Sequence, residues 1–484
     1  MDGRRRFSYC DGTRRDAELS ETADLVVIGG GPGGMAASLE AATHGSSVIL
    51  LEADSHIGGN AARSTGYLAF QNFDMQLEAG LTDSVETFVA DMTAEISRQN
   101  DRYGIAFDKD LAQLFAEESS ETYSWLVNLG FEFNRFLPRP KQHSVNRMVD
   151  VRDTTMFTSL FETALKEAGV KVVTGTRVRR LLTHEKSVVG VATDNDNFIA
   201  KKGVILATGG YQANSQIRIK YQPEMMAKTP YLGTKYDVGD GHLMGQEVGG
   251  DLINMTMIPP LIMVASALVE ESIAVNREGR RFHDEAGPYD YRVDQLSSQT
   301  DHLAWYVFDE RTAKNKQQLI DEMPEESQSA QTLNELAEII GCDGEGLTDS
   351  INEWNSYLSS TTVKDREFGR VIFPDPRIGI VEPPFHASRM IVGINFPAGG
   401  FRVTTDMQVV NVYGEPIGNL FAVGDCAGGM GPVIGMGGMR ITPALTLGRI
   451  AGRRIATSTI KETVSEEGFF EIPENKMKIP VVDE

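Results

Sequence analysis

The sequence predicts an α/β protein in which a dinucleotide-binding sheet is interrupted by a second, inserted domain. Two apolar runs, 24–28 and 47–51, flank a glycine-rich turn and a helix of small residues, which is the βαβ arrangement of a nucleotide fold. A similar apolar run returns late in the chain, at 419–425. Between them, residues 317–347 are rich in Glu, Gln, Ser and Asn and have helical spacing. The nucleotide fold is therefore expected to enclose a separate helical insertion.

The first βαβ unit carries the strongest local signal. The run 24–28 predicts a buried parallel strand, and Gly29, Gly31 and Gly34 follow it with Gly-X-Gly-X-X-Gly spacing before the next helix. Glycines at these places let the backbone turn tightly and approach a pyrophosphate held at the helix N-terminus. Glu52 ends the second strand, where a carboxylate can accept hydrogen bonds from a ribose.

The remaining elements follow from hydrophobic periodicity. Helical spacing runs through 84–130, most clearly at 110–129, and returns at 156–168 and 442–458. Short apolar runs predict further strands, at 170–173, 176–182, 188–193 and 204–210.

These elements divide the chain into four segments. Residues 1–20 are expected to form a disordered N-terminal arm. The nucleotide-binding domain is expected in two parts, 21–250 and 379–484, with a capping and substrate domain at 251–378 between them.

Composition excludes several classes of protein. The formal net charge of −22 argues against a nucleic-acid partner, which would require a basic face. The three cysteines, Cys10, Cys342 and Cys426, form no Cys-X-X-Cys pair, so neither a four-cysteine iron–sulfur cluster nor another metal site is expected. No apolar run reaches 18 residues, and the arginines at 4–6 are not followed by one, so we expect a cytoplasmic protein without a membrane span.

Further motifs accompany the first βαβ unit. They are Gly-Gly-Asn at 58–60, Ala-Thr-Gly-Gly at 207–210, Gly-Asp-Gly at 239–241, V-N-X-X-G-X-R-F-X-X-E at 275–285 and a closing Gly-Gly at 437–438. Together, over about residues 22–455, they resemble the FAD-dependent fumarate reductase and succinate dehydrogenase flavoprotein superfamily. The resemblance implies a Rossmann-like, glutathione-reductase-type FAD-binding domain with an inserted α+β capping domain.

The resemblance also implies where FAD binds. The expected contacts share one property, since they lie on the loops and helix starts that meet at the cofactor in this family. They are Gly29, Gly31, Gly33, Gly34, Glu52, Asn60, Ala61, Thr65, Gly66, Val178, Ala207, Asp240, Asp425, Arg440, Ile441 and Thr442. Covalent members attach FAD through a histidine after Gly-Gly-Asn, where this chain has residues 61–63 (Ala-Ala-Arg), so FAD is expected to be non-covalent.

Family members move a hydride between the flavin and one carbon while a side chain moves a proton at the next carbon. Fumarate reductases place one arginine four residues after the last Glu of the 275–285 motif and another just before the closing Gly-Gly. This chain has Tyr289 and Gly435 there, and Met257–Leu261 replaces a His-Pro-Thr type segment of the cap. Fumarate and succinate are therefore not the expected substrates.

The Pro288–Tyr289 pair instead resembles 3-ketosteroid Δ1-dehydrogenases, in which a tyrosine of this segment removes the α-proton. Those enzymes polarise the ketone with a second tyrosine and a glycine amide. Gly438 matches the glycine, whereas Ile434 stands in place of the tyrosine. The resemblance therefore implies Tyr289 as the base and the Gly438 amide as a stabiliser of the enolate.

Other side chains are expected near this centre. Tyr291 and Arg292 are alternative proton carriers, and His386, Ile434 and Met436 are candidate substrate contacts. Arg440 is expected at FAD, with a substrate carboxylate as its alternative partner.

The predicted activity is FAD-dependent desaturation of a cyclic ketone or keto acid beside its carbonyl. An external electron acceptor or donor is expected, because no second Gly-X-Gly-X-X-Gly follows a strand. The alternatives are an ene-reductase or a dehydrogenase resembling tricarballylate dehydrogenase at the same site, a flavin monooxygenase, and a flavin electron carrier without an organic substrate.

Overall fold

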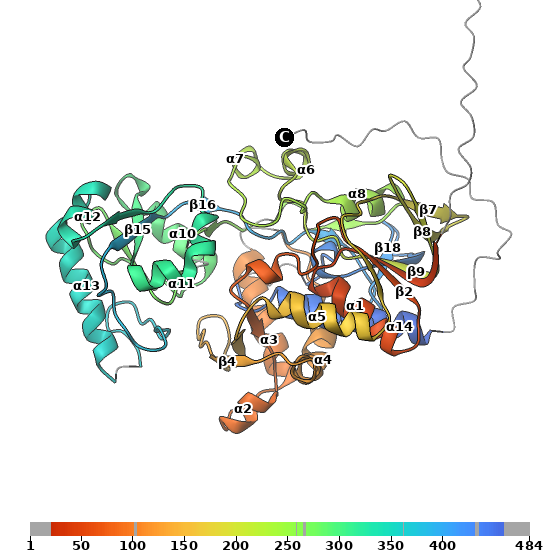
Figure 1. The fold of residues 1–484 in the computed structure, drawn as a ribbon, viewed down its shortest axis with the longest axis horizontal. Helices are drawn as coiled ribbons and strands as arrows, with labels where there is room; N and C mark the ends of the chain where they lie inside the picture. The colour runs from red at the N-terminus through yellow and green to blue at the C-terminus, as the bar shows by residue number, and fades with distance from the viewer. Residues whose placement is uncertain are drawn as a thin grey trace, which may run out of the picture.

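The computed structural model describes residues 21–100, 104–257, 259–264, 268–361, 363–430 and 435–458. The predicted N-terminal arm and Ile434 lie outside these residues. The ribbon forms two lobes of unequal size (Figure 1). The mixed α/β architecture confirms the fold class expected from the sequence.

The large lobe is built on an eight-stranded sheet in the order β18-β19-β8-β9-β1-β2-β6, with β7 paired to β8. The strands share this sheet although they come from both ends of the chain: β1 (Glu21–Ile28), β2 (Val48–Leu51), β6 (Lys171–Val173), β7 (Val178–His184), β8 (Ser187–Thr193), β9 (Asn197–Leu206), β18 (Gln408–Val410) and β19 (Pro416–Ala422). Strands β6, β2, β1, β9 and β19 run parallel. All four residues of β2 and the last four of β1 are buried, as the continuous apolar runs predicted.

Helices from distant parts of the sequence pack on this sheet. Helix α1 (Pro32–Thr43) lies against α14 (Ile441–Thr457), and both contribute to the core that contains β1 and β2. The continuous periodicity of 84–130 contains two helices, α3 (Val85–Asn100) and α4 (Lys109–Asn128), and Asp108 caps the second through the amides of Asp110 and Leu111. Helix α5 (Met156–Glu167) follows the prediction closely.

Shorter elements complete the large lobe. They are α2 (Asp74–Glu78), α6 (Ser215–Tyr221), α7 (Glu224–Ala227), α8 (Asp240–Glu247), the three-residue turns η1 (Ala61–Arg63) and η3 (Gly424–Cys426), and a sheet of β3 (Tyr67–Ala69), β5 (Met148–Val151) and β4 (Phe133–Phe136). Two antiparallel pairs join the middle of the chain to its later part: β10 (Leu252–Ile253) with β17 (Gly400–Phe401), and β11 (Leu261–Ile262) with β16 (Val392–Gly393).

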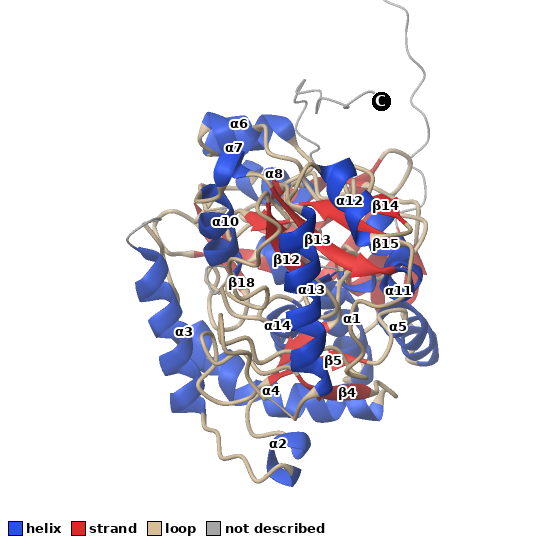
Figure 2. Cartoon of the chain, turned by 90° about the vertical axis from the view of Figure 1, so that its left-hand side faces the viewer, coloured by secondary structure: helices blue, strands red, loops and turns tan. Residues whose placement is uncertain are grey.

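The small lobe is an antiparallel sheet between two layers of helices. Its strands lie in the order β12 (Ile273–Asn276), β13 (Ala304–Asp309), β15 (Phe385–Arg389) and β14 (Gln328–Ala330), and η2 (Thr300–His302) precedes β13. Alternate strand residues face opposite sides: Ile273 and Val307 pack with α12 (Leu333–Ile340) and α13 (Gly344–Ser359), whereas Ala274 and Phe308 pack with α10 (Tyr289–Ser297) and α11 (Glu310–Asp321). Figure 2 views this lobe from its outer side, with α13 across the strands.

The chain returns from the small lobe later than the expected boundary at 379. Strand β15 at 385–389 pairs with β13 and β14, so it belongs to the small-lobe sheet. The sequence misplaced this boundary because a five-residue strand after two prolines leaves too short a pattern to assign to either sheet.

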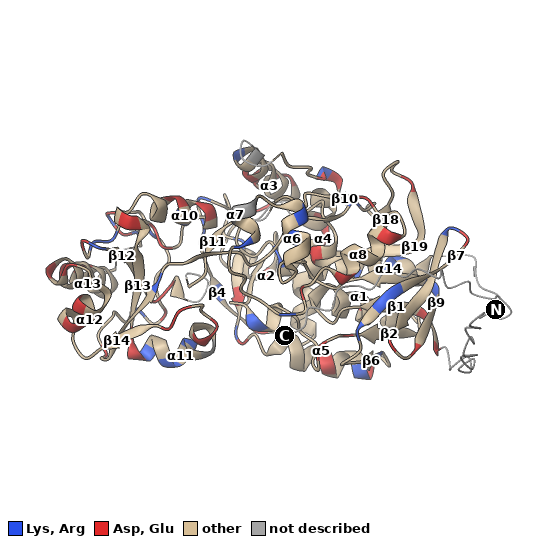
Figure 3. Ribbon diagram, turned by 90° about the horizontal axis from the view of Figure 1, so that it is seen from above, with Lys and Arg blue, Asp and Glu red and all other residues tan. Residues whose placement is uncertain are grey.

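Acidic residues lie on both lobes, on α5 and α12 for example (Figure 3).

Candidate functional site

A cavity of about 480 Å³ is lined by residues of both lobes. Its lining includes the glycine-rich turn before α1, the start of α14 and the first turn of α10 in the small lobe. Its volume lies within the range of small-molecule and cofactor sites. The cavity therefore joins the predicted cofactor loops to the predicted catalytic segment.

The N-terminus of α1 forms one end of the cavity. Gly31 caps the helix in an extended conformation, and a Cβ there would meet no protein atom within 4 Å. Gly34 instead packs against the preceding strand, since a Cβ at this position would lie 1.9 Å from the carbonyl oxygen of Gly29. The first amides of a helix have no helical acceptor, so this end is suited to a pyrophosphate.

Glu52 lies at the same end. Its Oε2 accepts a hydrogen bond from the Gly30 amide at 2.6 Å, and its Oε1 accepts one from the Asp54 amide at 2.7 Å. Burial raises the pKa of the carboxyl, and the backbone hydrogen bonds oppose that rise. The two amides fix the orientation of the carboxylate, which keeps lone pairs for further donors.

Most of the expected FAD positions line this cavity. They are Gly29, Gly31, Gly33, Glu52, Asn60, Ala61, Thr65, Val178, Ala207, Asp240, Asp425, Arg440 and Ile441. Three do not line it: Gly34 packs the helix onto the strand, Gly66 packs against Val151, and Thr442 accepts a hydrogen bond from the Ala69 amide. Asp240 lines the cavity, but Arg177 donates two hydrogen bonds to its carboxylate, each 2.7 Å long.

Asp237 is a buried carboxylate of the cavity wall that the sequence did not single out. Its Oδ2 accepts hydrogen bonds from Asn60 Nδ2 at 2.7 Å and from the Tyr231 hydroxyl at 2.6 Å. Burial raises its pKa to about 6, and the Tyr231 hydrogen bond opposes this rise. The position, three residues before Asp240 of the Gly-Asp-Gly turn, was the only available signal.

Arg440 lies where α14 begins. Its guanidinium lies 4.5 Å from the ring centroid of Phe396 and 3.7 Å from Asp425. Burial raises the pKa of Asp425, and Arg440 lowers it. The pair places a positive group beside the N-terminus of a long helix, where negative charge on a bound cofactor is stabilised.

The turn before α14 is fixed from two sides. Gln142 Oε1 accepts a hydrogen bond from the Gly437 amide at 2.8 Å, and His143 Nε2 donates to the Gly437 carbonyl at 2.9 Å. Gly438 has φ of +79°, and a Cβ there would lie 2.6 Å from the carbonyl carbon of Leu68. Gly438 and Met436 both line the cavity, so glycine is required at this point of the wall.

Tyr289 is the first residue of α10 and lines the cavity from the small lobe. Its ring lies 6.0 Å from that of Phe396, edge to face, and the Arg292 guanidinium lies 4.9 Å from its centroid. The same Phe396 ring also contacts the guanidinium of Arg440. The structure therefore brings Tyr289, Arg292, Arg440 and Gly438 to one cavity.

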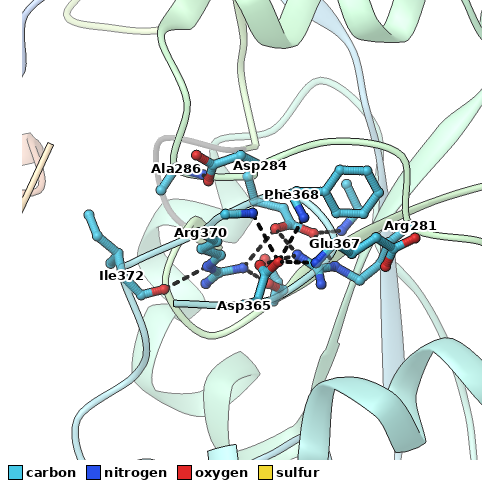
Figure 4. Close-up of polar contacts among 12 residues, drawn as sticks. Arg281, Asp284, Ala286, Asp365, Glu367, Phe368, Arg370 and Ile372 are labelled. Carbon is cyan, nitrogen blue, oxygen red and sulfur yellow. Dashed lines mark hydrogen bonds and ion pairs between the residues drawn. The ribbon is translucent and has the colours of Figure 1, made fainter. Parts of the chain in front are cut away.

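A buried ionic network holds the segment that leads to Tyr289. Glu285 accepts hydrogen bonds from Arg281 and Arg370 at 2.8–3.0 Å, and Arg281 also donates to Asp365 at 3.2 Å. Figure 4 shows Arg281, Asp365 and Arg370 converging. Burial raises the pKa of Glu285, but Arg281 and Arg370 outweigh it and hold that pKa well below its usual range.

Arg139 and Tyr67 are further cavity residues that the sequence did not indicate. Arg139 lies 5.8 Å from the centroid of the Tyr67 ring, and the Tyr67 hydroxyl donates to Glu270 at 3.0 Å. The loop that carries Arg139 reads Leu-Pro-Arg-Pro, with no periodicity to indicate which way a side chain points. Nothing in the sequence linked this loop with the site.

Two expected residues lie elsewhere. His386 is on β15, stacked on Phe308, with its Nε2 2.8 Å from Glu310 Oε2, and it does not line the cavity. Tyr291 faces Lys141, 5.2 Å from its ring centroid, because it lies two positions along α10 from Tyr289 and so points away. Neither side chain is therefore placed to contact a molecule in the cavity.

Two features are absent from the described residues, a membrane-spanning helix and a metal-binding cluster. None of their helices combines the length and apolar character needed to cross a membrane. No cluster of three or more His, Cys, Asp or Glu side chains among them is arranged to hold a metal ion.

Comparisons with known proteins agree over most of the chain. The family described as FAD binding domain matches residues 24–441. A probable fumarate reductase of Shewanella frigidimarina is 29% identical and aligns with 94% of this chain and 79% of its own. The open conformation of a flavocytochrome c3 fumarate reductase superposes with a TM-score of 0.69 at 27% identity, covering 91% of this chain and 79% of that one. A 3-ketosteroid-Δ4-(5α)-dehydrogenase from Rhodococcus jostii RHA1 shares the fold, with a TM-score of 0.64 at 24% identity and coverages of 92% and 99%.

Proposed function

The chain belongs to the FAD binding domain family and is an FAD-dependent oxidoreductase of CH–CH bonds, and from this premise we propose the reaction that its cavity performs. The substrate has a carbon–carbon double bond conjugated to a carbonyl or carboxyl group. Hydride is exchanged at the β-carbon, and Tyr289 exchanges the proton at the α-carbon. The observation that carries this proposal is the position of Tyr289, in the same cavity as the cofactor loops.

The residues present fit FAD held without a covalent bond. The helix start at Gly31 is open to the cavity, and the Glu52 carboxylate lies at the same end. Asn60, Arg440 and the start of α14 line the same cavity. Bound FAD supplies the hydride acceptor or donor of the reaction.

Tyr289 is suited to proton exchange by its surroundings. Its ring is held between Phe396 and the Arg292 guanidinium, which limits the directions in which the hydroxyl can point. The Gly438 amide, on the same wall, is available to a substrate oxygen that gains negative charge.

Reduction is the direction that we favour, because the relative and the structure of highest similarity described above are named fumarate reductases. Fumarate itself fits poorly. A Cβ at Gly435, where the family resemblance places a substrate arginine, would lie 1.7 Å from Glu95 Oε1. Glu95 thus occupies the space that such a side chain would need.

Desaturation of a cyclic ketone is the second candidate. It would use the same residues in reverse, with Tyr289 as the base. The observation that favours it is that Tyr289 and Gly438, the two positions that match 3-ketosteroid Δ1-dehydrogenases, line one cavity. Both directions require substrate access to Tyr289, which an electron carrier without an organic substrate would not need.

The two directions are separated by anaerobic flavin spectroscopy. Dithionite-reduced enzyme is mixed with acrylate, crotonate, cinnamate and cyclohexenone, and oxidised enzyme with the saturated counterparts. Reoxidation by an unsaturated compound, slowed about 10²- to 10⁴-fold in Tyr289→Phe, is the expected result. Bleaching of the oxidised enzyme by a saturated ketone would establish desaturation instead, and equal rates in Tyr289→Phe would exclude the tyrosine as proton carrier.

A further inference from the structure

Two buried arginines approach the cavity from opposite lobes. Arg139 lies on the loop before β5 in the large lobe, and Arg292 lies on α10 in the small lobe. Their residues are 8% and 4% exposed, and both line the cavity in which Tyr289 lies. Tyr289 connects them, since Arg292 stacks on its ring and Tyr289 and Arg139 interact electrostatically.

Neither of these two guanidinium groups forms an ion pair with a described residue. Arg139 donates one long hydrogen bond, 3.4 Å, to the Pro138 carbonyl. Arg292 donates one of 3.3 Å to the Glu285 carbonyl, and its Nε has no partner. Other buried arginines differ, because Arg147 pairs with Asp83 and Arg370 pairs with Glu285.

Such an arrangement is unfavourable unless an anion completes it. Burial lowers the pKa of Arg139, and Tyr67 and Glu270 oppose this effect while Arg292 reinforces it. Arginine nevertheless remains protonated, so the cavity wall carries two positive charges near each other. Buried charges are stable when they are paired, and a carboxylate is the group that a guanidinium binds best, by two parallel hydrogen bonds.

We infer that Arg139 and Arg292 form a binding site for a substrate carboxylate beside Tyr289. This inference rests on the proposed function and narrows its substrate to a conjugated carboxylic acid rather than a neutral ketone. The rest of the substrate lies against Val269, Leu319, Met323 and Met436, which line the same cavity, so an apolar substituent is expected. Because each arginine comes from a different lobe, the carboxylate links the lobes when it binds.

The site is separate from the pyrophosphate end of the cavity. The α1 N-terminus and Glu52 adjoin the large-lobe sheet. Arg292 and Tyr289 lie on the small lobe, and Arg139, on a large-lobe loop outside that sheet, interacts electrostatically with both. The anion bound by Arg139 and Arg292 is therefore expected to be part of the substrate and not of FAD.

Binding of cinnamate and of cinnamamide to the oxidised holoenzyme tests the inference. Oxidised flavin and an unsaturated compound do not react in either direction, so dissociation constants follow from the change in flavin absorbance. The amide has nearly the shape of the acid but no charge. Acrylate and crotonate, each with its amide, extend the test to smaller substituents.

The wild type is expected to prefer the acid. Arg139→Met and Arg292→Met should each reduce the acid-to-amide preference by about 10- to 150-fold, and Arg139→Lys should restore part of it. Arg152→Met removes the same charge at an exposed surface pair with Glu132 and should leave the preference unchanged. FAD content and thermal unfolding of each variant verify that the fold is retained.

The outcomes separate this inference from the proposed function. No preference for any of the three acids in the wild type, or an unchanged preference in both methionine variants, would overturn the carboxylate site even if enones are reduced. Retained preference in an enzyme that turns over none of the unsaturated or saturated compounds would support the carboxylate site and overturn the proposed reaction. Tyr289→Phe should keep the preference while losing turnover.

Discussion

Two groups of buried arginines differ in one respect. Arg281 and Arg370 converge on Glu285 and Asp365 and have carboxylate partners within the protein. Arg139 and Arg292 are almost equally buried, yet neither has an ion pair among the described residues. Burial of a charged side chain therefore does not by itself indicate a function. The lack of an ion pair among the described residues, beside a cavity, is what supports our assignment of Arg139 and Arg292 to ligand binding.

The largest effect is expected where the paired network is broken. Glu285→Gln removes the charge that both Arg281 and Arg370 face, and uncompensated buried charges should lower the free energy of unfolding by about 3–5 kcal/mol. Denaturant unfolding followed by circular dichroism measures this change. The control is Asp349→Asn, which breaks an exposed pair with Arg280 and should change stability by less than about 1 kcal/mol. Equal effects in both variants would mean that the network contributes no more than a surface pair.

Asp237 is a buried acidic group whose hydrogen-bonding side chains, Asn60 and Tyr231, are both neutral. Its pKa rises to about 6 from 3.8, so ionisation is up to about 3 kcal/mol less favourable in the folded protein than in the unfolded chain. Stability from this group is complete below pH 3.8 and is lost as pH rises through about 6. Asp237→Asn should therefore flatten the decline in stability between pH 4.5 and 7.5. A variant with the pH profile of the wild type would contradict the raised pKa.

At the cofactor end of the cavity, contacts with the backbone, and not charges, determine whether a substitution is tolerated. Gly34→Ala places a Cβ 1.9 Å from the Gly29 carbonyl oxygen and should cost about 1–3 kcal/mol of stability even without FAD. Gly31→Ala is the matched control, since its Cβ would meet no protein atom within 4 Å. It should leave the apoprotein stable and reduce FAD retention after gel filtration. Equal stability of the two apoprotein variants would mean that the turn relaxes around Gly34.

This difference also explains what could be predicted from the sequence. The cofactor end is encoded by short local patterns, such as the spacing of Gly29, Gly31 and Gly34, because a tight turn and a close approach need glycine wherever they occur. The first strands of the sheet could be predicted for the same reason, because a continuous apolar run such as 24–28 is typical of a buried parallel strand. The fold class and a dinucleotide-binding turn could therefore be predicted from local patterns, and the family resemblance added FAD as the cofactor.

The substrate end is formed by long-range contacts, which a single sequence does not encode locally. Arg139 and Arg292 lie 153 positions apart and meet only because two lobes close on one cavity. His386 resembled a cleft residue because it lies after two prolines near the expected return of the chain, but β15 carries it into the small-lobe sheet, next to Glu310. Which lobe a short strand joins depends on its pairing partners, and these come from distant segments.

The smallest effect is expected where the unpaired charge is removed. Arg139→Met should change the free energy of unfolding by less than about 1 kcal/mol, or raise it, because the methionine relieves the desolvation of a guanidinium that has no ion pair to lose. Arg370→Met, at a group that pairs with Glu285, should instead lose about 3–5 kcal/mol, although the same atoms are replaced. The two variants, unfolded side by side, compare the two kinds of buried arginine directly. A loss in Arg139→Met as large as that in Arg370→Met would place Arg139 among the structural arginines and remove the physical reason to assign it to a substrate.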